Sequence, residues 1–232
     1  LIPPGTFMMG SALNQKVTMR TPFYCAIYPI TEQQYCLIAG GTPANPREFK
    51  QYLSYDMIRG SVLGTKWPVH QQVDATSFVG KLRLRTGMTL DLPTSAQWEY
   101  AMRAGSDDAT FKNPNAWGIC DACQVVEWVL DWGANYNYNN KIDPVGPTSD
   151  ADNRHLTRGV GYSYESVNST IKNVTYKSVY ISYRGSTSYN SDYKNWYYIY
   201  YTANQTIACQ YGGWAEDKIG IGARLVALPV CK

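Results

Sequence analysis

The feature that most constrains the fold of this chain is a change in composition at Arg158. Up to that residue the sequence is that of an ordinary compact domain, whereas residues Gly159 to Trp214 are rich in Tyr, Ser and Asn, with Asp192 among them. Tyr offers a large flat contact with a polar tip at low entropic cost, and Ser and Asn adapt their hydrogen bonds. The segment 159–214 is therefore typical of a binding surface, carried by a core that the remaining residues build.

The tyrosines of this segment are too closely spaced for all of them to belong to a core, although structural tyrosines are the alternative to a binding surface. Residues 176–183 alternate, with Val179 and Ile181 on one face of an expected strand and tyrosines and serines on the other. The preference of Tyr for strands explains such a pattern. It does not explain the pairs Tyr197-Tyr198 and Tyr200-Tyr201, because strand neighbours point to opposite faces. At least one tyrosine of each pair is expected to be exposed.

Composition excludes several classes of function. The 232 residues carry 21 basic and 18 acidic side chains, a net charge of +3, and no dense basic stripe, so we expect no nucleic-acid partner. No stretch is long and apolar enough to insert into a membrane. No signal peptide is visible, but the first residue is Leu1, so a leader or a further N-terminal domain stays open.

The six cysteines favour structural roles. Cys120 and Cys123 form a C-x-x-C, which can bind zinc or react as a redox pair. A zinc site needs two more soft ligands, and the only histidines, His70 and His155, are isolated in sequence and interpreted as structural or solvent-facing. We expect no metal and favour buried or disulfide-bonded cysteines, without a pairing. The set is Cys25, Cys36, Cys120, Cys123, Cys209 and Cys231.

The order of expected elements predicts one α+β domain over 1–232, because helices come early, strands come late, and no linker or repeat divides the chain. Helix starts are expected at Thr31, at Asp74 or Thr76, and at Ser95 as N-caps. The expected helices are 32–38, 74 or 75 to about 85 with a stop at Gly87, and 95 to near Gly105. The expected strands lie within 1–10, 23–28, 176–183 and 219–230, whereas 42–66 and 135–147 are expected to be rich in loops.

A series of motifs in a fixed order resembles formylglycine-generating-enzyme-like domains. The most specific is Leu92-Pro93-Thr94-Ser95-Ala96-Gln97-Trp98-Glu99-Tyr100-Ala101-Met102-Arg103-Ala104-Gly105. The others are Ile2–Ser11, Tyr28–Tyr35, Trp67–His70, Val73–Ala75, Asn115–Asp121, Val126–Val129, Asp143–Pro147, Arg158-Gly159 and Ile221–Leu225. The resemblance implies a loop-rich C-type lectin fold of the formylglycine-generating-enzyme type. Within it, we expect Trp98, Trp117, Trp128 and Arg224 to hold the core.

The enzyme branch of this family is the first alternative. There, a reactive cysteine pair near the C-terminal end of the site oxidises a substrate cysteine with copper. The stretch that resembles this place is Val179–Arg184, and it contains no cysteine. Nor is the metal and histidine constellation of the related sulfoxide synthases evident. We therefore predict no catalytic residues, with an oxidase as the alternative, and interpret Asp121, Glu127 and Asp131 as packing and turn residues.

The second branch is ligand display. Variable proteins of diversity-generating retroelements resemble this domain with a hypervariable C-terminal stretch, in which adenine-directed copying converts Asn codons to Tyr, Ser and Asp. The segment 159–214 has that composition and position. It is also long for the family, so an inserted loop or hairpin is expected. A carbohydrate-binding lectin is a further alternative, although no Glu-Pro-Asn or Gln-Pro-Asp loop is present.

Two departures from the family pattern bear on cofactors and packing. Cys123-Gln124-Val125-Val126-Glu127-Trp128 replaces Gly-Asn-Val-Trp-Glu-Trp, and the missing Asn belongs to a family calcium site. We predict no cofactor, with a structural calcium ion as the alternative. Arg158–Tyr162 replaces Arg-Gly-Gly-Ser-Trp, which makes Tyr162 a buried scaffold candidate.

The resulting hypothesis is a display protein that binds a macromolecule, most naturally a protein on a target surface. Rigid aromatic side chains would anchor the ligand, with Ser, Asn and Asp adjusting hydrogen bonds around them. The expected location is a virion or a cell surface. The candidate ligand-binding residues are Tyr164, Tyr176, Tyr180, Tyr189, Asn190, Asp192, Tyr193, Asn195, Tyr197, Tyr198, Tyr200, Tyr201 and Asn204.

Overall fold

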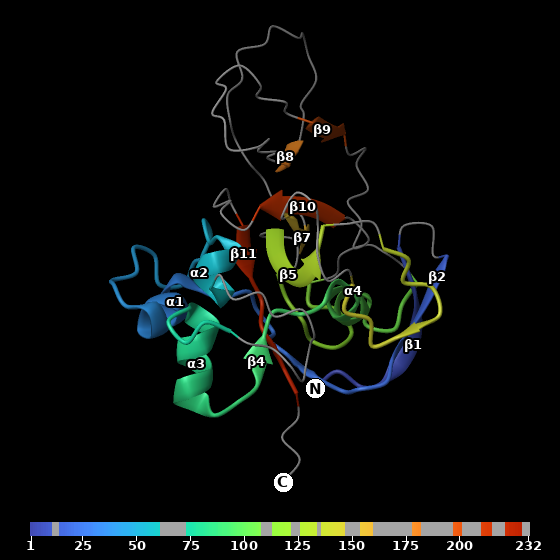
Figure 1. Ribbon diagram of the computed structural model, residues 1–232, viewed down its shortest axis with the longest axis horizontal. Coiled ribbons are helices and arrows are strands. Elements are labelled where there is room, and N and C mark those ends of the chain that lie inside the picture. The colour runs from blue at the N-terminus through green and yellow to red at the C-terminus, as the bar shows by residue number, and fades with distance from the viewer. Residues whose placement is uncertain are drawn as a thin grey trace, which may run out of the picture.

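Short helices and short strands joined by long loops make up the described part of the chain (Figure 1). The structure is a computed structural model that describes residues 1–10, 14–60, 73–107, 113–121, 126–133, 136–146, 154–159, 178–181, 197–200, 210–214 and 221–228. The helices are α1 Glu32–Ala39, α2 Tyr55–Arg59, α3 Phe78–Thr86 and α4 Ser95–Arg103. The mixed α+β class and the loop-rich character are confirmed, whereas the single domain over 1–232 stays a prediction.

The strands form several small sheets around one larger sheet. The strands are β1 Gly5–Met9, β2 Gln15–Met19, β3 Tyr24–Cys25, β4 Leu90–Asp91, β5 Val126–Trp132, β6 Lys141–Ile142, β7 Arg154–Arg158, β8 Ser178–Ile181, β9 Tyr197–Tyr200, β10 Gln210–Trp214, β11 Ile221–Ala223 and β12 Val226–Ala227. The larger sheet has the order β10-β7-β5-β11, and the smaller ones are β1-β2-β6, β3-β12-β4 and β8-β9. In Figure 1, β8 and β9 lie beyond β10, on the side away from both chain ends.

Helix α4 is the centre of the core. All nine of its residues are buried, and a capping box between Thr94 and Gln97 fixes its start. The indoles of Trp98 and Trp128 are fully enclosed. Helix α4 packs against β1, β5 and β7, so it joins the larger sheet to the β1-β2-β6 sheet. Burial of large aromatic side chains around a capped helix makes this part of the molecule the rigid base for the sheet.

The predicted helices exist, but two of the three begin elsewhere. Helix α1 begins after Thr31 with a complete capping box, as predicted. Helix α3 is capped by Ser77, three residues after Asp74, because the Asp74 carboxylate instead accepts hydrogen bonds from Thr76 within a turn. Helix α4 is capped by Thr94 and not Ser95. Prediction also missed helix α2 inside the expected loop region 42–66.

The predicted strands are present in shortened form. The opening strand is β1, the 23–28 strand reduces to β3, and the 176–183 strand is β8. The predicted terminal strand 219–230 breaks into β11 and β12 at Arg224 and Leu225. Strand β11 pairs with β5 in one sheet and β12 pairs with β3 and β4 in another, so the chain changes sheet at this break. Within the described residues, no helix has the length and apolar character to cross a membrane.

Candidate ligand-display site

The Tyr-rich segment leaves and rejoins the scaffold at neighbouring points. Strands β7 and β10 are antiparallel, and Arg158, the last residue of β7, is the register partner of Gln210, the first residue of β10. Gly159, which follows, has φ of 105°, a conformation that glycine adopts without steric cost. The residues between the two strands are thus one long connection within a β-hairpin. Its ends are held about 5 Å apart, the spacing of paired strands, whatever sequence lies between.

A second antiparallel pair lies within this connection. Strand β8 pairs with β9 so that Tyr180 stands opposite Tyr198 and Ser178 opposite Tyr200. Strand β8 also lies near β10, as Figure 1 shows. The predicted inserted hairpin therefore exists, nested inside the β7–β10 hairpin.

The ladder brings together four of the predicted binding positions. Tyr180 is on β8, and Tyr197, Tyr198 and Tyr200 are on β9, where the structure describes the backbone. The other nine predicted binding residues lie outside the described residues: Tyr164, Tyr176, Tyr189, Asn190, Asp192, Tyr193, Asn195, Tyr201 and Asn204. Their role stays a prediction.

Arg158 anchors the point at which the segment leaves the scaffold. Its Nη1 donates to Glu99 Oε2 at 2.9 Å, and its Nε and Nη2 donate to Ser95 Oγ at 2.9 and 2.7 Å. Arg158 and Glu99 form this ion pair in complete burial. Glu99 Oε1 in turn accepts from the Gly10 amide and from Arg103. One carboxylate of α4 thus holds β7 to the end of β1.

Arg224 anchors the chain after the segment in the same way. Its Nη2 donates to Glu127 Oε1 at 3.0 Å and to the Cys120 carbonyl at 2.8 Å. Glu127 Oε2 also accepts the Trp98 indole N–H at 2.8 Å. Glu127 is the register partner of both Arg158 in β7 and Gly222 in β11. Both anchors therefore meet at one position on β5.

Asp131 links these anchors through the start of α4. Its Oδ2 accepts the Ser95 amide at 2.6 Å, and its Oδ1 accepts the Tyr138 hydroxyl at 2.8 Å. Burial raises the pKa of Asp131 to about 7, because desolvation of the carboxylate outweighs these hydrogen bonds and the nearby charge of Arg158. Glu127 and Asp131 are thus packing residues, as predicted, and Asp121 hydrogen-bonds Asn113 in a turn.

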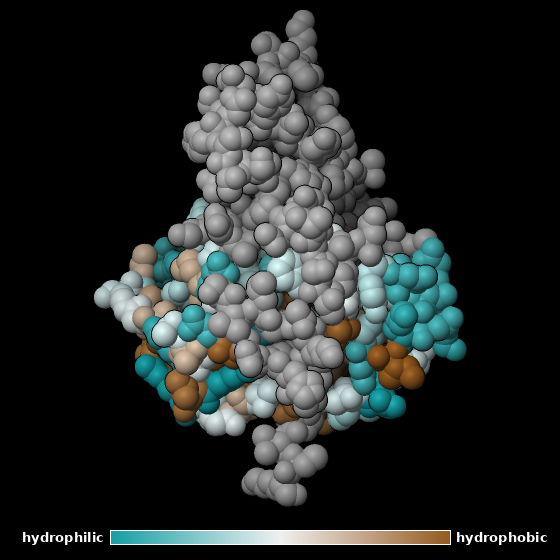
Figure 2. All heavy atoms as spheres, viewed as in Figure 1, coloured by the Kyte–Doolittle hydropathy of each residue, from teal (hydrophilic) through white to brown (hydrophobic). Residues whose placement is uncertain are grey.

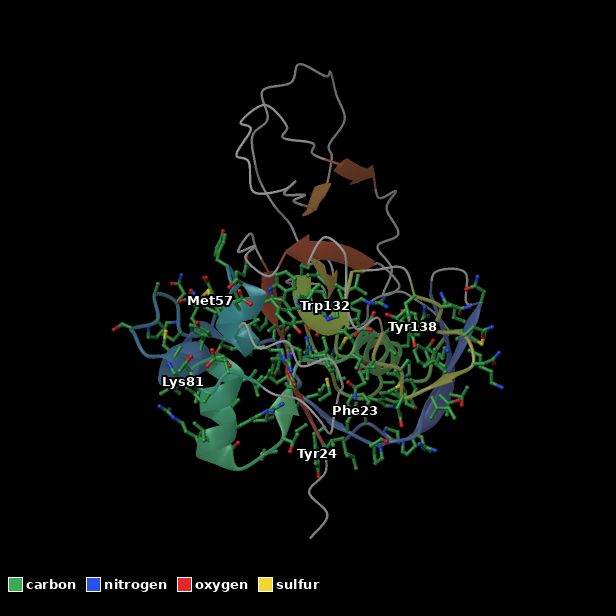
Figure 3. All side chains as sticks on the ribbon, in the orientation of Figure 1. Phe23, Tyr24, Met57, Lys81, Trp132 and Tyr138 are labelled. Carbon is green, nitrogen blue, oxygen red and sulfur yellow. The ribbon has the colours of Figure 1, made fainter. Side chains whose placement is uncertain are left out.

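A histidine on β7, the strand beside β10, packs between two aromatic rings. His155 is buried and stacks on Tyr55 with ring centroids 3.6 Å apart, and its ring lies tilted against Trp132 with centroids 4.1 Å apart. Figure 3 shows Trp132 in the half of the body next to β10, with Phe23 and Tyr24 in the opposite half. His155 is therefore structural, as predicted, whereas His70 lies outside the described residues.

The predicted core landmarks are mostly confirmed. Trp98, Trp128 and Arg224 are fully buried. Trp117 is half-buried and packs against the core at its margin, edge-on to Tyr100. Tyr162, the other scaffold candidate, lies outside the described residues.

Sequence reasoning missed the role of Glu99, the residue that connects most of the scaffold. The spacing of Ser95, Glu99 and Arg103 at every fourth position places these polar groups on one face of a helix that is otherwise buried. Two charged side chains and a hydroxyl group on a buried helix need hydrogen-bonding or charged partners. The polar residues at every fourth position of this helix could therefore have predicted a buried ion-pair network.

Cysteine chemistry receives no support from the described thiols. Cys25, Cys36 and Cys120 are free thiols, and Cys123, Cys209 and Cys231 lie outside the described residues. Burial raises the pKa of the Cys25 thiol to about 12, with the charge of Arg224 acting in the opposite direction. Thiolates are the reactive form, so this thiol is a poor nucleophile. Among residues that the structure describes, no cluster of three His, Cys, Asp or Glu side chains is arranged to hold a metal ion.

The described surface offers no single large apolar area in the view of Figure 2, where apolar residues are scattered among polar ones. Leu37, Tyr52 and Leu84 are the most exposed large apolar side chains of the helical region, at 65%, 64% and 77%. Scattered exposed apolar side chains are ordinary in globular proteins.

The fold defined by these elements is the C-type lectin fold of the formylglycine-generating-enzyme type. Residues 1–191 match the family model described as the sulfatase-modifying factor enzyme 1-like domain, and the chain belongs to that family. No curated protein sequence matches the chain.

Three solved structures share the fold. Variable protein 1 of Treponema denticola is 14% identical with a TM-score of 0.57, over 98% of this chain and 94% of that one. PvdO from Pseudomonas aeruginosa is 15% identical with a TM-score of 0.62, over 98% and 92%. CarF is 14% identical with a TM-score of 0.57, over 99% and 97%. The similarity covers almost the whole of each chain.

Proposed function

We propose that this protein is a ligand-binding display protein without enzymatic activity, of the kind that diversity-generating retroelements vary. The segment 159–214 would present Tyr, Asn, Ser and Asp to a protein on a target surface, from a virion or a cell surface. Binding requires no cofactor in this proposal. The scaffold of Arg158, Glu99, Glu127 and Arg224 would keep the fold while displayed residues change.

The observation that carries the proposal is the pairing of Arg158 with Gln210. A connection whose two ends lie on adjacent antiparallel strands can change in length and sequence at small entropic cost, because loop-closure entropy grows only slowly with length. The buried anchors contribute a second reason. Arg158 and Arg224 make their ion pairs with Glu99 and Glu127, which lie outside the segment. Substitutions within 159–214 therefore leave both anchors intact.

The similarity to Treponema denticola variable protein 1 supports the same function. The similarities to PvdO and CarF are of the same order, so the fold alone favours no branch. What separates display from the other branches is the composition of 159–214 together with its attachment to the β7–β10 hairpin.

The genetic test is to sequence the locus from several isolates. Display predicts a reverse transcriptase gene beside a near-copy of the 3′ coding segment that differs at adenines. It also predicts that amino-acid differences between isolates concentrate in 159–214 and spare Glu99, Glu127, Arg158 and Arg224. Differences spread evenly over the chain, without a neighbouring reverse transcriptase, would contradict the proposal.

An oxidase is the second candidate, and membership of the sulfatase-modifying factor enzyme 1-like family is the observation that favours it. The test is to incubate the protein with copper, oxygen and a cysteine-containing peptide, and to trap any aldehyde product with a hydrazide. Display predicts no aldehyde above a control without protein. Aldehyde that forms with the protein and disappears when Cys209 and Cys231 are replaced by Ser would establish the oxidase instead.

A further inference from the structure

The register of the β8–β9 ladder divides its eight positions into two faces. Opposite residues of an antiparallel pair share a face, and faces alternate along each strand. One face has the positions of Ser178, Tyr180, Tyr198 and Tyr200, and the other has those of Val179, Ile181, Tyr197 and Ile199. The first face is thus made of hydroxyl-bearing residues, and the second is mostly β-branched aliphatic.

We infer that the target contact of this ladder is the hydroxyl face, centred on the Tyr180/Tyr198 pair, and that its partner is an uncharged patch of a protein surface. The inference rests on the proposed function. It assigns Tyr197 to the opposite face of the ladder, away from the target contact. Among the predicted binding residues on the ladder, Tyr197 then stands apart from Tyr180, Tyr198 and Tyr200.

The aliphatic face requires cover. A two-stranded ladder is marginally stable in water unless one face packs on other structure. Strand β8 lies near β10, which forms the edge of the larger sheet and contains Gly212 and Gly213. Glycines inside a strand mark places where another segment approaches closely. The β10 edge is therefore the natural support for the face that carries Val179 and Ile181, which leaves the hydroxyl face for a ligand.

The chemistry of the hydroxyl face selects the partner. Neither β8 nor β9 contains a charged residue. Opposite tyrosines on one face of a ladder offer flat aromatic area with phenolic donors and acceptors at its rim. Such a surface suits a partner patch of apolar side chains and peptide groups, the composition of the centre of a protein interface. A charged patch would lose its hydration there without gaining a counter-charge.

The test compares two matched libraries of the full chain, displayed on yeast. In one, Ser178, Tyr180, Tyr198 and Tyr200 are randomised among Tyr, Ser, Asn and Asp, and in the other the four opposite positions are randomised in the same way. Folding is scored by resistance to protease. We expect most clones of the first library and few of the second to be resistant. Equal tolerance of both libraries, or greater loss in the first, would overturn the assignment of faces.

The partner class is tested by selection and by glycan binding. The resistant clones of the first library are selected on immobilised ubiquitin, and the unvaried protein is applied to a glycan array. We expect ubiquitin binders whose affinity falls at least tenfold on Tyr180→Ala or Tyr198→Ala where those tyrosines are retained, and no glycan binding. Glycan binding by the unvaried protein would overturn the partner class. Failure to obtain any binder from folded clones would contradict display itself, although the face assignment would stand.

Discussion

Excision of the long connection between β7 and β10 should leave a folded and more stable scaffold. The change replaces residues 159–209 with Asn-Gly, the dipeptide favoured by two-residue hairpin turns, between Arg158 and Gln210. Because these residues are register partners, the new turn closes a hairpin that already exists. Arg158 keeps its bonds to Glu99 and Ser95, which lie on α4.

The gain follows from loop-closure entropy. For a connection treated as an unstructured loop, shortening from about 50 residues to about 2 reduces the entropic cost of closure by (3/2)RT ln 25, about 3 kcal/mol. For a chain of this size, that corresponds to a rise in the unfolding temperature of roughly 6–12 °C. Packing of β8 near β10 is lost in the excised protein, so the figure is an upper bound.

The assay is equilibrium unfolding in urea, followed by tryptophan fluorescence. A matched variant carries an eight-residue Gly/Ser linker in place of Asn-Gly. Its free energy of unfolding should be lower than that of the Asn-Gly variant by about 1 kcal/mol, because the loop-closure term rises by (3/2)RT ln 4. Loss of a cooperative transition, or a free energy of unfolding below that of the intact chain in both variants, would refute the reasoning. Either result would mean that the core needs the excised residues.

Three further outcomes can be measured on the intact chain. Arg158→Met should reduce the free energy of unfolding by about 1–3 kcal/mol, because Glu99 Oε2 and Ser95 Oγ lose buried hydrogen bonds while Arg103 still pairs with Glu99 Oε1, whereas Arg20→Met at an exposed position should change it by under about 0.5 kcal/mol; equal effects in urea would contradict the anchor. The pKa of Asp131 is raised to about 7, which means that folding favours its protonated form. The contribution of Asp131 to the free energy of unfolding is therefore complete below the unfolded pKa of about 4 and is lost as pH rises through 7. The stability of the protein relative to Asp131→Asn should therefore fall between pH 4 and 8 in urea titrations, and a constant difference would refute the shift. Cys25, which is partly buried, should react only slowly with iodoacetamide at pH 8 until the protein is denatured, as peptide mass spectrometry would show; rapid labelling of the folded protein would contradict its raised pKa.

Local signals in the sequence predicted those elements whose causes are local. Helix α1 follows from Thr31 and the glycine after its last residue, and both are close in sequence to the helix that they bound. The β8 strand follows from alternation within eight residues. The start of α3 was wrong because Asp74, Thr76 and Ser77 are all capable caps, and only their mutual hydrogen bonds decide between them.

Pairings between distant residues were beyond sequence reasoning. The pairing of β7 with β10 joins residues on either side of a long connection, and nothing in their local pattern specifies it. The break between β11 and β12 also depends on distant residues. At this break Arg224 donates hydrogen bonds to Glu127 and to three backbone carbonyl groups that are far from it in sequence. The candidate site was predicted in composition and general place, but its separation into two ladder faces required the register.

The buried charges of this scaffold are better understood as a means of fixing register than as a source of stability. A buried ion pair stabilises little relative to apolar packing, but loss of one partner is costly. If β7 slipped by one residue along β5, its side chains would exchange faces. Arg158 would then leave Glu99 and Ser95, and its guanidinium charge would lose its ion pair inside the protein. Arg224 imposes the same penalty through Glu127 where the chain returns. Strand β7, which precedes the connection, and strand β11, which follows it, are thus held in register on β5 by residues outside the connection. This property is what a scaffold needs when the sequence that it carries is subject to change.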